Sequence, residues 1–385
     1  MQILSLFDGM SCGYLAFNQL GVDIERYAAY EIDDFAVQVS EANLPIVEHK
    51  GDVFKADFKQ YKGSVDWLIG GSPCTYWSIG QSDKRETIAS GLGWELFSQY
   101  ARALKESEPE YFLYENNKSM SDDIKAEIVK VFGFEPFCIN SAAFSAQNRQ
   151  RYYWVGQRQL DGTYLPISLD SVKPCDIQLD DVLDVVVKNT LGVTSVYATG
   201  DIKADICKAK ALGVTREGKA FCLTAGYSNG SGENIGNYAA HTLEKSCKSM
   251  VAEPVVLDKE SYSFFDKEGY QQTVVYADVV EYSDLGVPVK AVSVADNNTY
   301  VLHRVSNGCL TIKGKQYKVS LADGYYILRK FTVNECKRLQ TVPEWFNMSV
   351  PNKQAYKLLG NGWTVSVIAY LIQNAMGEDL DFEVV

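Results

Sequence analysis

The sequence has 385 residues, of which 46% are hydrophobic, and its formal net charge is −12. This length fits two domains with sizeable apolar cores, and no apolar stretch is long enough to span a membrane. The N-terminus lacks a basic region followed by an apolar stretch and a cleavage site, so we expect a cytoplasmic protein without a secretion signal.

Cysteine usage excludes two common classes of small domain. The nine cysteines are odd in number, and no two stand in a Cys-x-x-Cys pair. This pattern argues against a disulfide framework and against a zinc site, so we expect no metal. Most of these thiols should be reduced and buried as small apolar groups.

The charge is unevenly distributed along the chain. Residues 251–300 carry nine acids and three bases, whereas residues 301–338 carry eight bases and two acids. An acidic chain is an unusual nucleic-acid binder, but a basic stretch can still form a DNA face. The alternative is that these lysines and arginines are simply solvated.

The first 156 residues alternate strand-like and helix-like segments. Short apolar runs predict strands at 3–7, 26–30, 65–69 and 111–114. Helical patterns end at Leu20 and cover 121–132, with Ser121 as N-cap and Gly133 just past the end. This alternation predicts an α/β fold with a doubly wound parallel sheet, whose ligands bind at the carboxyl ends of the strands.

The rest of the chain changes character twice. Residues 157–330 are rich in Gly, Ser, Asn and Tyr with short β-branched and aromatic runs, which predicts a second, β-rich domain. Thr332 and Glu335 then form a capping box, and residues 364–375 are apolar enough for a core helix. We expect that helix to cover one face of the N-terminal sheet.

Three weak signals together favour a nucleoside ligand. The turn after the first strand contains Gly9 and Gly13 but lacks the three-glycine pattern that cradles a pyrophosphate. Glu31 follows the second predicted strand, where an acid can accept hydrogen bonds from ribose hydroxyls. Asp52 is a further acid suited to an adenine amino group.

Cys74 stands in the sharpest motif of the chain, Gly70-Gly71-Ser72-Pro73-Cys74, directly after a predicted strand. A cysteine at the ligand-binding edge of a sheet can act as a nucleophile when its thiolate is favoured. The alternative, a structural cysteine, is the ordinary expectation for any one of nine.

Further chemical groups fall at the same edge. Glu115 follows the fourth predicted strand, and Arg149 and Arg151 are spaced to share one side of an extended strand. Each alone is more simply a solvated charge at a strand end. A thiol, an acid and guanidinium groups gathered together make a plausible catalytic constellation.

In this order, the motifs resemble those of the DNA cytosine-5 methyltransferases. The resemblance rests on Phe7-Asp8-Gly9 through Gly13, Ser72-Pro73-Cys74, Glu115-Asn116-Asn117, Gln147-x-Arg149-x-Arg151, Arg329 to Gln340, and Gly360-Asn361-Gly362. It covers nearly the whole chain except roughly 160–320. Six motifs in the same order as in this family are, taken together, highly specific for it.

The resemblance implies a Rossmann-like catalytic domain at 1–160, a smaller target-recognition domain at 161–328 and a C-terminal return at 329–385 that completes the first. It implies S-adenosyl-L-methionine as cofactor and methylation of a flipped-out cytosine in double-stranded DNA, through an adduct between Cys74 and C6. Glu115, Arg149 and Arg151 would assist Cys74, and a loop at 75–94 would close over the base. The implied cofactor residues are Phe7, Asp8, Gly9, Gly13, Glu31, Ile32, Asp52, Val53, Ser72, Pro73, Asn361 and Trp363.

The motifs also depart from the family pattern. Ser72 and Thr75 flank Pro73-Cys74, where the family commonly has Pro and Gln. The Ser72-Pro73-Cys74 motif also resembles that of the animal de novo DNA methyltransferases. Asn117 replaces the usual Val, and Trp363 stands where a small or aliphatic residue is common. None of these departures removes a catalytic group.

Three rival functions stay open at this point: a tRNA cytosine methyltransferase, a NAD-dependent oxidoreductase and an inactive binding protein. The Cys-Phe-Thr tripeptide of the tRNA branch is missing, and NAD would need a better glycine loop. The compact length favours a bacterial or phage source. We also expect a nucleoid-associated monomer, with a cognate restriction endonuclease as a candidate partner.

Overall fold

The structure is a computed structural model that divides into two compact units. Unit 1 comprises Met1–Asp176, Leu223–Ser228 and Lys337–Val385, and unit 2 comprises Ile177–Cys222 and Asn229–Cys336. None of the described helices is long and apolar enough to cross a membrane. The residues that the structure describes are 1–78, 85–172, 175–183, 210–212, 219–223, 239, 243, 249–255, 262–265, 271–274, 279–282, 288–292 and 299–377.

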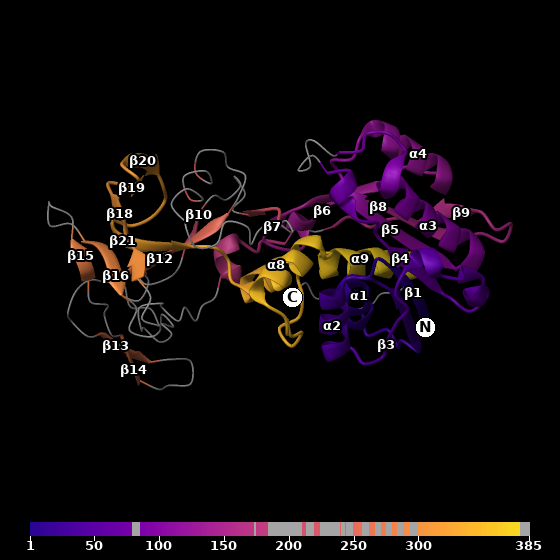
Figure 1. Ribbon diagram of the computed structural model, residues 1–385, viewed down its shortest axis with the longest axis horizontal. Helices are drawn as coiled ribbons and strands as arrows, with labels where there is room; N and C mark the ends of the chain where they lie inside the picture. The colour runs from indigo at the N-terminus through magenta and orange to yellow at the C-terminus, as the bar shows by residue number, and fades with distance from the viewer. Residues whose placement is uncertain are drawn as a thin grey trace. The chain divides into compact units, whose positions relative to one another are not determined.

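Unit 1 is built on a mixed sheet in the order β3-β2-β1-β4-β5-β8-β6 (Figure 1). The first five of these strands are parallel, as the sequence predicts for a doubly wound fold. Strand β8 is antiparallel to β5, and β6 and β9 pair with β8 in the same antiparallel sense. The strands are β1 Gln2–Leu6, β2 Arg26–Tyr30, β3 Val47–His49, β4 Trp67–Gly70, β5 Tyr111–Asn117, β6 Phe137–Asn140, β8 Gln150–Arg158 and β9 Tyr164–Pro166.

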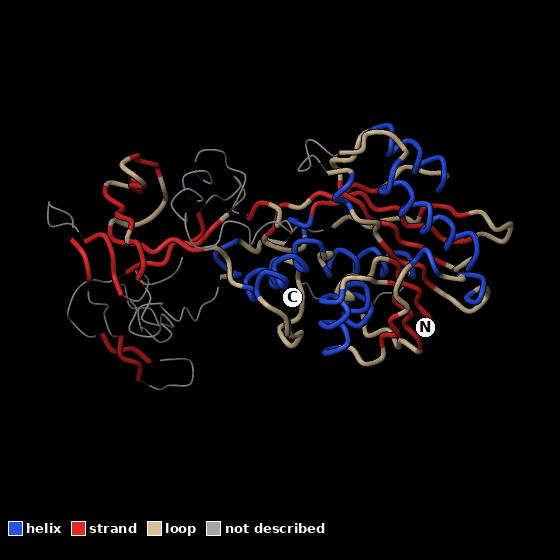
Figure 2. Tube along the Cα trace, viewed as in Figure 1, coloured by secondary structure: helices blue, strands red, loops and turns tan. Residues whose placement is uncertain are grey.

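Helices cover both faces of this sheet (Figure 2). Alternate strand residues such as Leu4, Leu68 and Phe112 are buried in one core cluster that also contains side chains of α3 and α4. On the opposite face α1 packs against the C-terminal helix α9, and both belong to unit 1. The helices are α1 Cys12–Gln19, α2 Asp34–Asn43, α3 Gly91–Ser107, α4 Asp122–Phe132, α8 Asn352–Asn361 and α9 Val365–Met376.

One strand boundary differs from the sequence expectation in a way that concerns the site. Strand β5 continues through Glu115 to Asn117 instead of ending at Tyr114. Its last residues pair with β8, with Asn117 opposite Arg151. Antiparallel neighbours satisfy the main chain of polar residues here, which apolar periodicity cannot reveal. The acid therefore projects from a rigid strand and not from a loop.

Unit 2 is β-rich, as predicted. Its largest sheet has the order β10-β12-β21-β18-β19-β20, with antiparallel pairs throughout. The Thr332–Glu335 capping box is present: Glu335 N–H donates to Thr332 Oγ1 at 3.1 Å, and Thr332 N–H donates to the Glu335 carboxylate at 2.7 Å. It begins helix α7, Val333–Leu339. The strands are β10 Lys210–Leu212, β12 Met250–Val255, β18 His303–Ser306, β19 Cys309–Ile312, β20 Lys315–Lys318 and β21 Gly324–Arg329.

Smaller strand groups complete the described part of unit 2. A hairpin is formed by β13 Tyr262–Phe265 and β14 Gln271–Val274, and a three-stranded group by β15 Val279–Tyr282, β16 Pro288–Val292 and β17 Thr299–Val301. Strand β14 covers part of one of the short β-branched and aromatic runs that predict this domain, and residues 275 and 276 of that run lie outside the described residues.

Gly13 is required by close packing between α1 and the sheet. A Cβ on Gly13 would lie 2.3 Å from Ile69 Cδ1 and 2.9 Å from Tyr27 Oη. We therefore expect Gly13→Ala to lower the free energy of unfolding by about 2 kcal/mol, because overpacking a filled core outweighs the helix propensity of alanine. Urea denaturation measures this. Asn18→Ala, on the exposed side of the same helix, is the matched control, and equal stability of both variants would contradict the packing argument.

Candidate active site

The Asp8 side chain holds the turn between β1 and α1 through hydrogen bonds to three hydroxyl groups. Its Oδ1 accepts hydrogen bonds from Ser5 Oγ at 2.5 Å and Tyr27 Oη at 2.7 Å, and its Oδ2 accepts from Ser11 Oγ at 2.5 Å. Burial raises the pKa of this carboxyl group, and the hydroxyl donors oppose that effect. The side chain therefore shapes the turn and does not project outward toward a ligand.

The turn itself has an unusual backbone. Phe7, Gly9 and Ser11 all have φ values near +60°, which is costly for the two residues that carry a side chain. Gly9 N–H donates to Glu31 Oε2 at 2.8 Å, which joins the ends of β1 and β2. Strain of this kind persists only where surrounding contacts enforce it, and it is concentrated at functional sites.

Glu31 and Ile32, directly after β2, place a carboxylate and an aliphatic side chain next to each other beside this turn. Glu31 Oε1 accepts from the main-chain N–H groups of Ile32 and Asp33 at 2.7 and 2.8 Å, while burial raises the pKa of its carboxyl group. Ile32 is 74% exposed. An exposed aliphatic side chain next to an oriented carboxylate fits a nucleoside, with an apolar base and a ribose that donates hydrogen bonds.

The other predicted cofactor residues occupy different environments. Asp52 caps the short helix η1, Val53–Lys55, because its Oδ1 accepts from Phe54 N–H at 2.9 Å. The Val53 side chain is buried in the core, and the Val53 carbonyl accepts from Arg102. Asn361 is exposed at the end of α8. In the described residues no group of three or more potential ligands could hold a metal ion.

The nucleophile motif is held by buried polar contacts. Ser72 Oγ lies 2.6 Å from Tyr114 Oη, and Asn116 Nδ2 donates to the Ser72 carbonyl at 3.1 Å. Pro73 is the N-cap of the short helix η3, Cys74–Tyr76, so Cys74 lies at its first position. Ser72 is 3% exposed, which makes it an anchor for Cys74.

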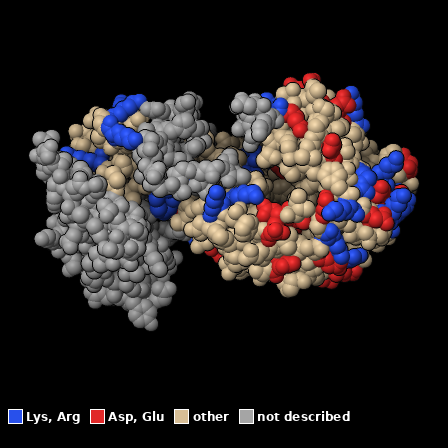
Figure 3. Space-filling view, viewed as in Figure 1, with Lys and Arg blue, Asp and Glu red and all other residues tan. Residues whose placement is uncertain are grey.

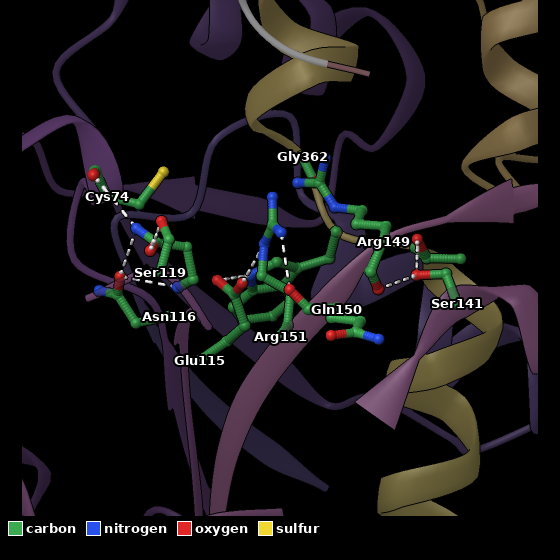
Figure 4. A network of polar contacts seen from close by, with 12 residues as sticks. Cys74, Glu115, Asn116, Ser119, Ser141, Arg149, Gln150, Arg151 and Gly362 are labelled. Atoms are coloured by element: carbon green, nitrogen blue, oxygen red, sulfur yellow. Dashed lines mark hydrogen bonds and ion pairs between the residues drawn. The ribbon is translucent and has the colours of Figure 1, made fainter. Parts of the chain in front are cut away.

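The thiol of Cys74 lies in an environment of opposing charges (Figure 4). Burial raises its pKa, and the nearby Glu115 carboxylate acts in the same direction. Arg151, Arg149 and a hydrogen bond from the Asn117 side chain lower that pKa. With a raised pKa the thiol is protonated at rest, and the guanidinium groups of Arg151 and Arg149 lie where they can stabilise the thiolate.

Glu115 is fixed by one donor on each carboxylate oxygen. Oε1 forms an ion pair with Arg151 Nε at 3.1 Å, and Oε2 accepts from Trp363 Nε1 at 3.0 Å. A Cβ on Gly71 would lie 2.9 Å from Oε2, so glycine is needed for this approach. The family resemblance implies Trp363 as a cofactor residue. Its contact with Glu115 cannot be predicted from the sequence, because the two positions are 248 residues apart.

The two arginines of the Gln-x-Arg-x-Arg motif have different partners. Arg149 lies between β7, Gln147–Asn148, and β8, and its guanidinium donates to the carbonyl oxygens of Leu223, Gly360 and Gly362 at 3.0, 3.2 and 2.9 Å. Arg151 lies within β8 and pairs with Glu115. The break between the strands turns the two side chains to different surroundings.

Part of the loop predicted at 75–94 is described. Residues 79–84 lie outside the described residues. Arg85 donates to the carbonyl oxygens of Trp77 and Ser119 at 3.2 and 2.5 Å, and Gly91–Trp94 already belong to α3. The C-terminal part of this segment is therefore fixed by hydrogen bonds from Arg85 and by helix α3.

Comparison with known proteins identifies the family. Residues 1–376 match the family model described as C-5 cytosine-specific DNA methylase. The chain therefore belongs to the C-5 cytosine-specific DNA methylase family, as the ordered motifs predict.

Individual relatives match over shorter stretches. The chain is 33% identical over 172 residues to the orphan methyltransferase M.SPRI of Bacillus phage SPR, covering 41% of this chain and 38% of that protein. It is 32% identical over 173 residues to the type II methyltransferase M.FnuDI of Fusobacterium nucleatum, covering 41% and 47%. These matches span less than half the length of either relative.

Solved structures support the fold over the full chain. A mutant of Spodoptera frugiperda DNMT2 matches with a TM-score of 0.53 and 16% identity, covering 97% of this chain and 99% of that one. S. pombe Dnmt2 methyltransferase matches with a TM-score of 0.52 and 14% identity, covering 98% of each chain. The predicted combination of a Rossmann-like domain with a β-rich second domain is confirmed.

The different surroundings of the two arginines predict different consequences of mutation. Arg149→Gln should lower the free energy of unfolding by about 3 kcal/mol, because buried carbonyl groups lose a charged donor. Arg151→Gln should cost only about 1 kcal/mol, since glutamine can still donate to Glu115. Chemical denaturation of both variants measures the difference, and equal losses would contradict the distinct environments described above.

Proposed function

We propose that this protein is a sequence-specific DNA cytosine-5 methyltransferase that uses S-adenosyl-L-methionine and a covalent Cys74–C6 adduct. The observation that carries the proposal is the arrangement of Cys74, Glu115 and Arg151 at the carboxyl edge of the sheet. Membership of the C-5 cytosine-specific DNA methylase family supports it. The target cytosine leaves the duplex, because its ring carbons are inaccessible within the stack.

Cys74, Glu115 and Arg151 have different roles in the proposed reaction. Cys74 attacks C6 as the thiolate, and Glu115 holds and protonates N3, which removes the negative charge that develops on the ring. Arg151 keeps Glu115 oriented and, with Arg149 as the second cation near the thiol, stabilises charge in the adduct. Loss of the C5 proton to water after methylation expels Cys74 as the thiolate, and N3 returns its proton to Glu115.

The cofactor residues proposed here fit a nucleoside. Glu31 would accept from ribose hydroxyls, Ile32 and Phe7 would contact the adenine, and Asp52 would accept from its amino group. The main chain at Gly9, Gly13, Val53, Ser72, Pro73 and Asn361, together with Trp363, would line the remainder, with Asp8 supporting the turn. When bound, S-adenosyl-L-methionine supplies an electrophilic methyl group for C5.

Unit 2 is proposed as the target-recognition domain. Arg304, Lys313, Lys315 and Lys318 of the predicted basic stretch are exposed on or between β18, β19 and β20. Among the described residues, acidic and basic side chains are interspersed over unit 1, whereas basic ones predominate where β18–β20 lie (Figure 3). By contrast, Arg329 pairs with the buried Glu335, and Arg338 with Glu344.

Double-stranded DNA is the proposed partner, and a monomer is the proposed form. M.SPRI is named an orphan methyltransferase and M.FnuDI a type II methyltransferase, so a cognate restriction endonuclease is a candidate partner whose presence depends on the host. We propose a bacterial or phage protein acting at the nucleoid in the cytoplasm.

The decisive experiment incubates the pure protein and S-adenosyl-L-methionine with unmethylated genomic DNA and maps 5-methylcytosine by sequencing. We expect methylation at one recurring motif with the wild-type protein. Cys74→Ala should abolish it while the affinity for S-adenosyl-L-methionine, measured by calorimetry, stays within about twofold, because the thiol lies outside the proposed nucleoside contacts. Methylation by Cys74→Ala would disprove the nucleophile assignment.

A parallel incubation with RNA tests the rival acceptor. Modification of transfer RNA with none of DNA would reject the DNA assignment. Binding of the cofactor without modification of either acceptor would favour an inactive binding protein.

Removal of exposed cations from unit 2 should weaken DNA binding through phosphate contacts. For the double variant Arg304→Gln/Lys318→Gln, we expect the slope of log K against log salt concentration to fall in magnitude by about 2, because two counterion-releasing contacts are lost. Fluorescence anisotropy at several salt concentrations measures it. Lys105→Gln/Lys130→Gln, exposed on α3 and α4, is the charge-matched control, and an equal change in that variant would show that net charge alone is responsible.

A further inference from the structure

Asn117 is a polar residue where the family motif usually has valine. It is the last residue of β5 and is only 4% exposed. A buried primary amide is costly unless its donors and acceptor are hydrogen-bonded. The partners of this amide therefore indicate why an asparagine is accommodated beside the nucleophile.

The amide is oriented toward Cys74. Asn117 Nδ2 donates to the Cys74 carbonyl oxygen at 3.3 Å, and Asn117 Oδ1 accepts from Ser119 Oγ at 2.7 Å. Because the hydroxyl of Ser119 donates to the oxygen, the nitrogen end must face Cys74. Ser119 is itself held by Arg85, whose guanidinium donates to the Ser119 carbonyl at 2.5 Å.

The same amide also affects the protonation of the thiol. A hydrogen bond from the Asn117 side chain lowers the pKa of Cys74, in the same direction as Arg151 and Arg149 and against burial and Glu115. These groups come from β5, from β8, and from Arg149 between β7 and β8. A neutral donor stabilises a thiolate without adding a charge that would compete with Arg151 for Glu115.

We propose that Asn117 is a positioning residue for the nucleophile, whose amide fixes the main chain at Cys74 and donates a hydrogen bond to the thiolate. A valine at this position could do neither. The proposal rests on the proposed function of Cys74, and it adds a specific device by which this chain prepares that residue for attack.

The test measures the reactivity of Cys74 directly. Wild-type protein and Asn117→Val are treated with iodoacetamide from about pH 7 to about pH 11, because burial raises the pKa of Cys74 above the ordinary thiol value. Alkylation of the peptide that contains Cys74 is followed by mass spectrometry, which separates it from the other eight cysteines. We expect the midpoint of the pH–rate profile to rise by about one unit in Asn117→Val, because one hydrogen bond to the charged form is lost.

Two further variants keep the test decisive. Ser119→Ala retains the amide but frees its orientation, so its midpoint should move in the same direction by a smaller amount. Asn18→Val, exposed on α1, controls for the same chemical change elsewhere and should leave the profile unchanged. If Asn117→Val does not fold, Ser119→Ala decides the question alone.

Turnover provides an independent readout. In Asn117→Val we expect kcat for methylation to fall about tenfold with KM for DNA unchanged, since the lost interaction acts in the attack and not in binding. An unchanged alkylation profile in a folded Asn117→Val protein would overturn the proposal. Alkylation needs neither DNA nor methyl donor, so this failure is distinguishable from failure of the proposed methyltransferase function, which Cys74→Ala tests.

Discussion

The site depends on the Glu115 carboxylate being held in one orientation by donors from two distant parts of the chain. Arg151 on β8 and Trp363 near the C-terminus each bind one oxygen. With both oxygens engaged, the group is fixed at low entropic cost, as preorganised catalysis requires. The C-terminal segment therefore completes the site as well as the fold.

Main-chain carbonyls impose a second constraint on the same region. Residues 360–362, at the C-terminal end of α8, present carbonyl oxygens that the helix itself does not satisfy. Arg149 and Gln340 supply the missing donors, with Gln340 Nε2 donating to the Leu359 carbonyl at 2.6 Å. A guanidinium suits this task because its planar donors can bind several carbonyls together. The segment that carries Trp363 is fixed by these contacts, which links the cofactor side of the site to the acid.

Sequence patterns predicted those features that arise from local physics. Apolar runs and turn residues located β1, β2, β4 and α4, and the capping box of Thr332 and Glu335 was predicted from spacing alone. The contact of Trp363 with Glu115 and the turning apart of Arg149 and Arg151 could not be predicted, because both depend on which distant backbone lies nearby. Asp8 illustrates the same limit: a carboxylate after a strand suggests a ligand contact, yet three hydroxyl donors turn it into the core.

The charges around Cys74 create a conflict that the rest of the site must resolve. In the proposed reaction Cys74 attacks as the thiolate, while the Glu115 carboxylate lies close enough to raise the pKa of the thiol. Adding more cations would favour the thiolate but would also compete with Arg151 for the Glu115 carboxylate. A neutral amide avoids this difficulty, because it stabilises a neighbouring anion through a dipole whose influence falls off more steeply with distance than that of a charge. An asparagine beside the cysteine, with Arg151 paired to Glu115, supplies a hydrogen-bond donor near the thiol without adding a further charge to the site.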